Sequence, residues 1–405
     1  MIGFWAESES EVTDAAAIAS AVLSFMVFSD YGSNIAIFAK VSGMKGRLDE
    51  KSVILLLDLQ TEKNNQMEEK EIKIYPFSLE AVEDEAVWGT ESWKLSDLGF
   101  RDSKIRRGLL EGNTISEVME TYLDRIVGDD TYYFYGRQFP VQVKELKVTS
   151  RQPLLVCPDD EIAGERYDSL GKLKIWYIAQ AAPDAKVMVG FRHDLSATDF
   201  YEACLDGSIA DHLNEVPVKK GDCYLIKPGT VHCADKGVTI IEVSESSDLD
   251  LRICNWGRTM DSQDDPVFLE EAFDFVNMKA ETPILTDSHK LSELEQFIAT
   301  RIDLADPVRI ENGESKSYTV YHCVSGSAVI QTPAVRDNGE KYMESMALSA
   351  GETAVVPAEI QEFFLVPNAV AAVLIEVRAG EIEREIQASS DSEDEEGSRP
   401  ITSLN

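Results

Sequence analysis

One stretch, Lys220–His232, constrains the fold of this chain more than any other. Within it, Cys223–Ile226 is a short apolar run bounded by Gly221-Asp222 and by Pro228-Gly229, which predicts a buried strand between two tight turns. His232 follows the second turn closely, and in a β-barrel this layout places an imidazole at the barrel mouth, where ligands and metals commonly bind. The alternative is a structural histidine satisfied by a hydrogen bond.

The residues around this stretch show the spacing of short apolar runs and turns that is typical of a β-barrel with a few helices. Short apolar runs separated by turns begin near Ile72, and a helical insert is expected at 197–213. Thr114 and Glu117 have the spacing of a capping box, which predicts a helix with Ile115, Val118, Tyr122 and Ile126 on its apolar face. The predicted strands are 141–148, 154–157, 173–179, 186–191, 223–226 and 238–243.

A second β-rich unit is expected because Gly351–Pro357 echoes the stretch that begins at Gly221. The chain then divides into a small α+β appendage at 1–70, a first barrel at 71–262, a connection with a short helix at 263–290, a second barrel at 291–382 and an acidic tail at 383–405. The tail is too charged to pack and is expected to be disordered. In the appendage, a helix ending at Phe28 and strands at 34–41 and 52–60 around a Gly43–Gly46 turn are predicted.

Charge excludes several classes of partner. The sequence has 73 acidic and 38 basic side chains, a formal net charge of −35, so nucleic acid and anionic membranes are unfavourable partners. The six cysteines form no Cys-x-x-Cys pair, which is typical of a reducing compartment. The longest apolar run, Ala15–Phe28, is too short to span a bilayer and follows no basic leader, so a cytoplasmic protein is predicted.

Several short motifs occur in a fixed order along residues 72–380. They are Tyr75-Pro76-Phe77, Val87-Trp88-Gly89, Glu91-Ser92-Trp93, Phe139-Pro140, Gly171-Lys172, Trp176-Tyr177-Ile178, Gly229-Thr230-Val231-His232, Ser246-Ser247-Asp248 and Arg252. In this order they resemble the short bacterial form of class I mannose-6-phosphate isomerase, a cupin family. The resemblance implies a mainly β protein with two tandem cupin-type (jelly-roll) barrels, the first of which contains the active site.

The metal site of that family is altered here. The resemblance implies one divalent metal, usually zinc, held by a Gln-x-His pair, a Glu and a second His. Those four positions are Leu155, Cys157, Lys174 and His232 in this sequence. Leu cannot coordinate, a lysine brings positive charge, and Cys157 with His232 supplies two ligands where stable sites need three or four. We therefore expect no metal cofactor.

The positions that contact the sugar phosphate in the family are better preserved. Lys144, Lys172 and Arg252 occupy family positions and imply a pocket for an anionic carbohydrate such as a hexose phosphate, with Glu242 beside them. A Lewis-acid metal lowers the activation barrier by several kcal/mol, and each ~1.4 kcal/mol is roughly tenfold in rate. Without the metal, isomerisation would slow about a thousandfold or more. Lys174 could instead act as the electrophile, its charge standing where the metal stood in the family, with Arg252 stabilising the enediolate.

Three functions follow from these residues. The first is a metal-free, catalytically impaired member of the family that binds a sugar phosphate. The second is a working mannose-6-phosphate isomerase with Lys174 as electrophile or with an unusual metal site. The third is a structural or interaction protein that associates with itself or with a protein partner through residues 1–70 or through the acidic tail.

Overall fold

The computed structural model describes residues 73–256, 267–312, 317–336, 338–368 and 371–380, together with the backbone of three strands before residue 48. The chain divides into two units, Met1–Lys73 and Ile74–Asn405. The predicted strand at 52–60 and the predicted disordered tail lie outside the described residues.

In the first unit the described elements are strands. β1 (Ser24–Phe28), β2 (Ala36–Val41) and β3 (Met44–Arg47) form an antiparallel sheet in that order. The predicted helix through Phe28 is therefore wrong at its end, because the run Ser24–Phe28 pairs along its whole length with β2 and its Phe and Val residues favour strands. β3 also begins within the predicted Gly43–Gly46 turn, so the turn between β2 and β3 is tighter than expected.

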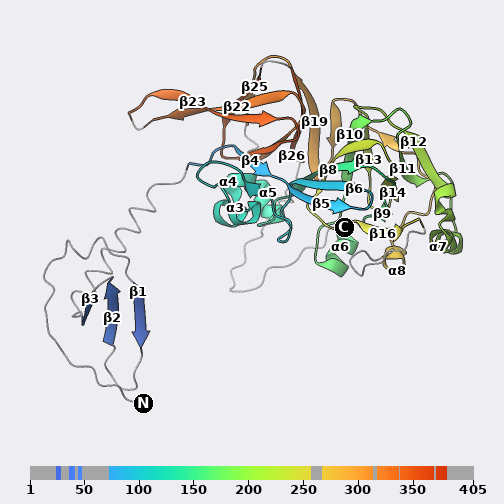
Figure 1. The fold of residues 1–405 in the computed structure, drawn as a ribbon, viewed down its shortest axis with the longest axis horizontal. Helices are drawn as coiled ribbons and strands as arrows, with labels where there is room; N and C mark the ends of the chain where they lie inside the picture. Colours follow the sequence, from blue (N-terminus) through green and yellow to red (C-terminus); the bar gives the residue numbers. More distant parts are fainter. Residues whose placement is uncertain are drawn as a thin grey trace, which may run out of the picture. The chain divides into compact units, whose positions relative to one another are not determined.

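Two antiparallel sheets form the first barrel of the second unit (Figure 1). One sheet has the order β17-β13-β10-β15-β8-β6-β5 and the other β12-β11-β14-β9-β16. Their strands are β5 (Val82–Ala86), β6 (Gly89–Leu95), β8 (Val141–Val148), β9 (Leu154–Val156), β10 (Lys174–Ala181), β11 (Lys186–Phe191), β12 (Leu213–Pro217), β13 (Cys223–Ile226), β14 (His232–Ala234), β15 (Val238–Glu245), β16 (Leu251–Cys254) and β17 (Ile284–Leu285). All six strands predicted from the sequence are present. Trp176, Val187 and Tyr224 pack in one buried cluster with residues from both sheets.

The second barrel is built from a seven-stranded sheet, β18-β19-β26-β21-β24-β4-β7, and a four-stranded sheet, β20-β25-β22-β23. Its strands are β4 (Phe77–Glu80), β7 (Lys104–Ile105), β18 (Lys290–Glu293), β19 (Phe297–Leu304), β20 (Val308–Glu311), β21 (Thr319–Ser325), β22 (Ser327–Val335), β23 (Lys341–Ser349), β24 (Thr353–Val356), β25 (Glu362–Pro367) and β26 (Ala372–Ala379). β4 and β7 come from the sequence range predicted for the first barrel but pair in the larger sheet of the second, so residues 71–262 contribute strands to both barrels. The prediction of a mainly β, cupin-like fold is confirmed.

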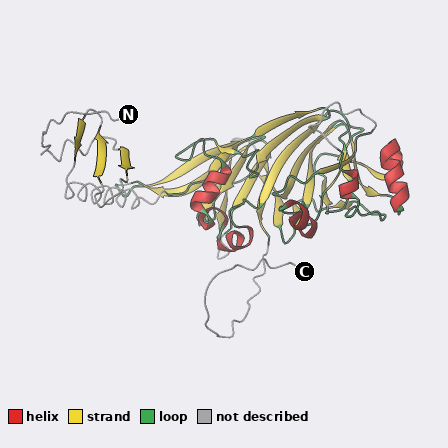
Figure 2. Cartoon of the chain, turned by 90° about the horizontal axis from the view of Figure 1, so that it is seen from below, coloured by secondary structure: helices red, strands yellow, loops and turns green. Residues whose placement is uncertain are grey.

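The helices lie outside the strands, most of them on one side of the sheets (Figure 2). They are α3 (Ile115–Tyr122), α4 (Asp124–Val127), α5 (Asp129–Tyr135), α6 (Asp160–Tyr167), α7 (Ala197–Asp206), the 3-10 helix η1 (Ser208–His212) and α8 (Leu269–Ala272). The predicted capping box is present, since Glu117 N–H donates to the Thr114 hydroxyl and Thr114 N–H donates to the Glu117 carboxylate. Ile126 belongs to α4 and not to α3, because Leu123 adopts a positive φ of 51° and ends α3. None of the helices in the described ranges is long and apolar enough to cross a membrane.

Candidate functional site

Three neighbouring strands of the smaller sheet bring four of the predicted site positions together. Leu155 in β9 lies opposite His232 in β14 and opposite Arg252 in β16. Residues directly opposite in antiparallel strands present their side chains on the same face of the sheet. Cys157 follows the end of β9 by one residue, two positions beyond Leu155, so its side chain reaches the same side of the barrel.

The larger sheet supplies the other predicted residues. Trp176 in β10 lies opposite Glu242 in β15, and Glu242 lies opposite Lys144 in β8. Lys174 is two residues before Trp176 on the same strand, and therefore on the same face. Lys172 enters the same space from the segment just before β10.

These lysines meet in a cluster of ion pairs around Asp250. Lys172 Nζ lies 2.5 Å from Asp250 Oδ2, and Lys174 Nζ contacts Asp250 Oδ1 directly and lies 3.3 Å from Glu242 Oε2. Lys144 Nζ lies 2.9 Å from Glu91 Oε1, 3.5 Å from Asp250 Oδ2 and 3.8 Å from Glu242 Oε1. We call these six residues, Lys144, Lys172, Lys174, Glu91, Glu242 and Asp250, the ion cluster.

The ion cluster is buried and balanced in charge. Its lysine side chains are at most 3% exposed, whereas Asp250 is 18% and Glu91 24% exposed. Three ammonium groups face three carboxylates, which is the condition under which charges persist away from water. Trp176 supports the arrangement because its Nε1–H donates to Glu242 Oε2 at 2.7 Å. The cluster therefore meets solvent through its carboxylates.

Attraction within the cluster shifts the pKa values of Asp250 and Lys174 so that both stay charged. Burial alone would raise the pKa of Asp250, but Lys172, Lys174 and Lys144 hold it well below its usual value. Burial lowers the pKa of Lys174, yet Asp250, Cys157 and Glu242 raise it well above the usual value. The pKa of Lys172 is lowered, first by burial and then by the other two lysines, despite its contact with Asp250. Lys174 is thus fixed as a cation.

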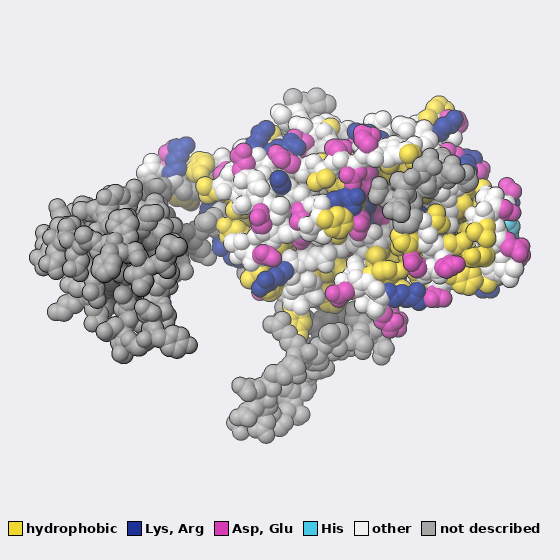
Figure 3. Space-filling model, turned by 60° about the horizontal axis from the view of Figure 1, so that its bottom comes forward, with side chains coloured by type: hydrophobic (Ala, Val, Ile, Leu, Met, Phe, Trp, Pro, Cys, Tyr) yellow, Lys and Arg dark blue, Asp and Glu magenta, His cyan; other side chains and the backbone are white. Residues whose placement is uncertain are grey.

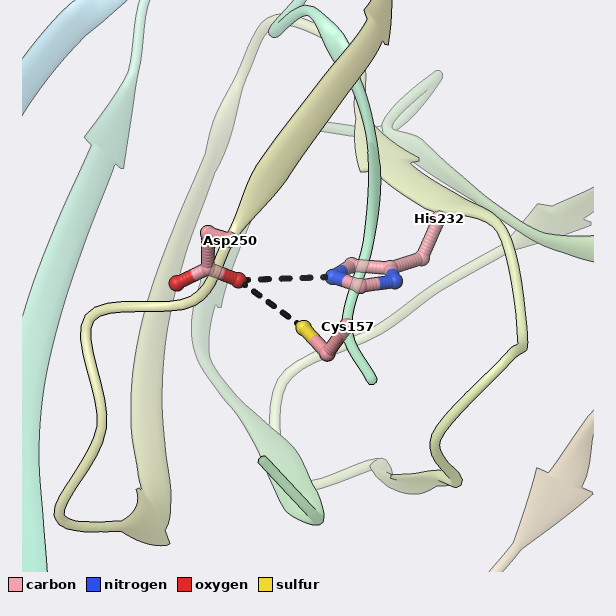
Figure 4. Close-up of side chains that lie close together, drawn as sticks. All are labelled: Cys157, His232 and Asp250. Carbon is pink, nitrogen blue, oxygen red and sulfur yellow. Dashed lines mark hydrogen bonds and ion pairs between the residues drawn. The ribbon is translucent and has the colours of Figure 1, made fainter. Parts of the chain in front are cut away.

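His232 and Cys157 face the same carboxylate (Figure 4). His232 Nδ1 lies 2.9 Å from the Thr230 carbonyl oxygen, which requires a proton on Nδ1, and Nε2 is then the unprotonated nitrogen, 4.0 Å from Asp250 Oδ1. Burial and the Lys174 charge lower the pKa of His232 to about 4, so the imidazole is neutral at pH 7. Cys157 Sγ donates to Asp250 Oδ1 at 3.2 Å, and burial followed by Asp250 raises the pKa of its thiol.

Cys157, His232 and Asp250 present three ligand atoms within 4.8 Å of one another, one more than the sequence indicated. The same Asp250 oxygen, however, is in contact with the Lys174 ammonium, and Cys157 is held as a thiol. A divalent cation at this point would have to displace a buried ammonium and remove the Cys157 proton. As folded, these side chains fit an internal ion pair and do not fit a zinc ion.

Sequence reasoning missed two members of the cluster, Asp250 and Glu91, as partners of the lysines. Both carboxylates could in principle have been predicted from the sequence as partners of the lysines. Three lysines directed into one barrel require carboxylates nearby, and Asp250 is two residues before Arg252 on the approach to β16. Arg252 itself is half-buried beside the cluster. Burial lowers its pKa, while Glu91, Asp250 and Asp248 act in the opposite direction.

All six cysteines lie among the described residues, and each is buried and outside any disulfide. Acidic and basic side chains are interspersed on the face shown in Figure 3, where no broad basic area is visible. The described surface on that side therefore offers no positively charged platform for a polyanion.

Comparisons with known proteins agree with the fold. A Bacillus subtilis protein named probable mannose-6-phosphate isomerase GmuF is 24% identical over 313 residues, which cover 71% of this chain and 95% of that protein. Mannose-6-phosphate isomerase of Streptococcus mutans is 27% identical over 42% of this chain and 52% of its own length, so there the similarity spans about half the relative. No family model matches the chain.

Solved structures show the same architecture. The crystal structure of mannose 6-phosphate isomerase from Bacillus subtilis has a TM-score of 0.63 at 21% identity and covers 75% of this chain and 99% of that one. A mutant phosphomannose isomerase from Salmonella typhimurium has a TM-score of 0.59 at 14% identity, covering 76% of this chain and all of that one. In sequence and in fold the chain is mannose-6-phosphate isomerase-like.

Proposed function

We propose that this chain is a mannose-6-phosphate isomerase-like protein that needs no metal, has lost most or all isomerase activity and binds a carbohydrate at the mouth of its first barrel. The observation that supports this most directly is the position of Lys174. Its ammonium lies against Asp250 and Glu242 on the inner face of the barrel, next to His232. Lys174 stands at a metal-ligand position of the similar family, so its ammonium supplies a permanent positive charge where the resemblance implies a bound metal ion.

The cost to catalysis is large. A metal that polarises a carbonyl contributes several kcal/mol to a barrier, and each ~1.4 kcal/mol is roughly a factor of ten in rate. Without that contribution, isomerisation slows about a thousandfold or more. Binding of a sugar does not need the metal, because hydroxyl groups are recognised by carboxylates, amides and aromatic rings.

A working isomerase with Lys174 as the electrophile is the second candidate. Lys174 is charged, as an electrophile must be, but it is wholly buried and already neutralised by two carboxylates. An electrophile must reach the substrate oxygen to stabilise its developing charge. The geometry therefore favours a binding protein over this mechanism.

The predicted hexose phosphate stays a prediction. Lys144 and Lys172, which were expected to bind the phosphate, are both paired with carboxylates, and an anion would compete with Asp250 and Glu91 for them. A cytoplasmic location and association through residues 1–70 also remain proposals.

An isomerase assay tests this function. Purified protein is incubated with mannose 6-phosphate, with and without excess chelator, and fructose 6-phosphate is measured by a coupled assay. We expect turnover roughly a thousandfold or more below that of an ordinary enzyme, whose kcat is about 1–1000 per second. Ordinary turnover would refute the proposal, and chelator-insensitive turnover that Lys174→Ala abolishes would establish the lysine mechanism instead.

A further inference from the structure

A groove of about 600 Å³ opens beside the ion cluster. Its walls are residues 97–100, the exposed side of α3, residues 137–138, residues 167–169 at the end of α6, and residues 248–249. This volume falls within the range of small-molecule sites. Asp248 and Leu249 immediately precede Asp250, so one wall of the groove continues directly into the cluster.

We infer that this groove binds an uncharged, hydroxyl-rich sugar and discriminates against sugar phosphates. The inference rests on the proposed function, in which the barrel mouth holds a carbohydrate, and it specifies the chemical class of that ligand. Three features of the walls and of the residues next to them support it: an exposed aromatic ring, an excess of carboxylates, and buried hydroxyls with no hydrogen-bond partner among the described residues.

The aromatic wall is formed by Phe100 and Tyr167. Phe100 is 63% exposed, and the Arg101 guanidinium carbon lies 5.1 Å from its ring centroid on one side. Arg101 is itself tethered to Asp84 at 2.6 Å and to Asp248 at 3.5 Å, so the ring is held at the groove. An exposed ring face leaves apolar surface in water that the C–H face of a pyranose can cover.

The charge of the walls decides between a neutral sugar and a phosphate. Four carboxylates line the groove, those of Asp97, Glu120, Asp168 and Asp248, against two cations, Arg137 in the lining and Arg101, which pairs with Asp248. Ionised carboxylates accept strong hydrogen bonds from hydroxyl groups but repel a phosphate. In the neighbouring ion cluster, the members that reach solvent are again carboxylates, those of Asp250 and Glu91.

Two hydroxyls behind the walls add an independent observation. The Gln138 side-chain N–H donates to the Ser246 carbonyl at 2.9 Å, and the Ser246 hydroxyl is buried with no hydrogen-bond partner among the described residues. The Ser96 hydroxyl, which directly precedes Asp97, is in the same state within that part of the chain. Buried polar atoms of this kind are normally satisfied by ordered water, which indicates hydrated positions next to the groove residues Asp97 and Gln138.

Calorimetric titration of the full chain with mannose and with mannose 6-phosphate tests the inference. We expect mannose to bind at least roughly tenfold more tightly than its phosphate, and Phe100→Ala to weaken mannose binding by about tenfold, a change of ~1.4 kcal/mol. Phe134→Ala is the matched control, because Phe134 is a 47% exposed phenylalanine in α5 that does not line the groove. It should leave binding unchanged.

A variant that removes two groove carboxylates tests the discrimination against the phosphate. The pair Glu120→Gln and Asp168→Asn alters two exposed groove residues, and we expect it to reduce the discrimination against mannose 6-phosphate. Tighter binding of the phosphate than of mannose by the unaltered chain, or equal effects of the Phe100 and Phe134 variants, would overturn the inference while leaving the proposed function in place. Failure of both sugars to bind at millimolar concentration would overturn both. Isomerase turnover, measured separately, bears on the proposed function alone.

Discussion

Replacement of Lys174 by methionine is the most informative perturbation of the ion cluster. Methionine has a similar length and no charge, so Lys174→Met removes the cation without opening a large cavity. Asp250 and Glu242 then lose the ammonium that lies between them, although Lys172 and Lys144 remain in contact with them.

The expected loss of stability follows from this geometry. Removal of one partner from a buried ion pair costs about 3–5 kcal/mol, and the remaining lysines favour the lower end, ~3 kcal/mol. With about 2–4 °C of Tm per kcal/mol for a large domain, Tm should fall by roughly 6–12 °C. The matched control is Lys147→Met, since Lys147 is 57% exposed and pairs with Glu145 at 3.0 Å on the neighbouring surface of β8. We expect about 0–1 kcal/mol there.

The same variant should gain an affinity for zinc. Without the ammonium, Cys157, His232 and Asp250 leave three ligand atoms within 4.8 Å of one another, a sufficient set for a tetrahedral site completed by Glu242 or water. At a zinc concentration about a hundredfold above Kd, binding would restore ~2.7 kcal/mol. Thermal unfolding of both proteins, with zinc and with chelator, measures this. A Lys174→Met variant as stable as the parent, or a parent stabilised by zinc, would refute the reasoning.

Three further predictions concern other buried or capping groups. Burial holds the pKa of His232 and of His322 at about 4, below the unfolded value of 6.5. Between these two pH values the unfolded state binds more protons than the folded state. The free energy of unfolding therefore falls as pH drops from 6.5 to 4, by up to ~3 kcal/mol for each histidine. His322→Gln should flatten that slope in urea unfolding across this range, and an unchanged slope would count against it. The pH dependence from Glu245 runs the opposite way, because burial raises its pKa from 4.5 to about 8 and stability falls as pH rises through that window. Glu245→Gln should therefore stabilise the protein at pH 9. Destabilisation by this variant at that pH would contradict the assignment. Thr114→Ala removes the capping box of α3 and should cost ~1 kcal/mol by chemical denaturation.

The sequence predicted the parts of the fold that depend on local pattern. Strands 141–148, 186–191 and 223–226 have their predicted bounds because short apolar or alternating runs between turn residues mark them directly. One error arose where a single backbone conformation decided the outcome. Leu123 at positive φ separates α3 from α4, and a leucine gives no sequence signal for that conformation.

The candidate site was predictable in its members but not in its pairing. The family resemblance identified Cys157, Lys174 and His232 as neighbours, and they do converge on one carboxylate. The carboxylate itself, Asp250, lies outside the quoted motifs, and its role depends on the register between β16 and β9. Ion-pair partners are set by such long-range pairing, so composition and spacing alone could not distinguish an anion pocket from a self-neutralised cluster.

The metal content of the purified protein tests the central claim most directly. The full chain is exposed to excess zinc, dialysed against buffer and analysed by mass spectrometry for metal and by amino-acid analysis for protein. The account predicts far less than one zinc ion per chain, because the Lys174 ammonium already neutralises Asp250. One tightly held zinc ion per chain, lost when His232 is replaced by alanine, would contradict it.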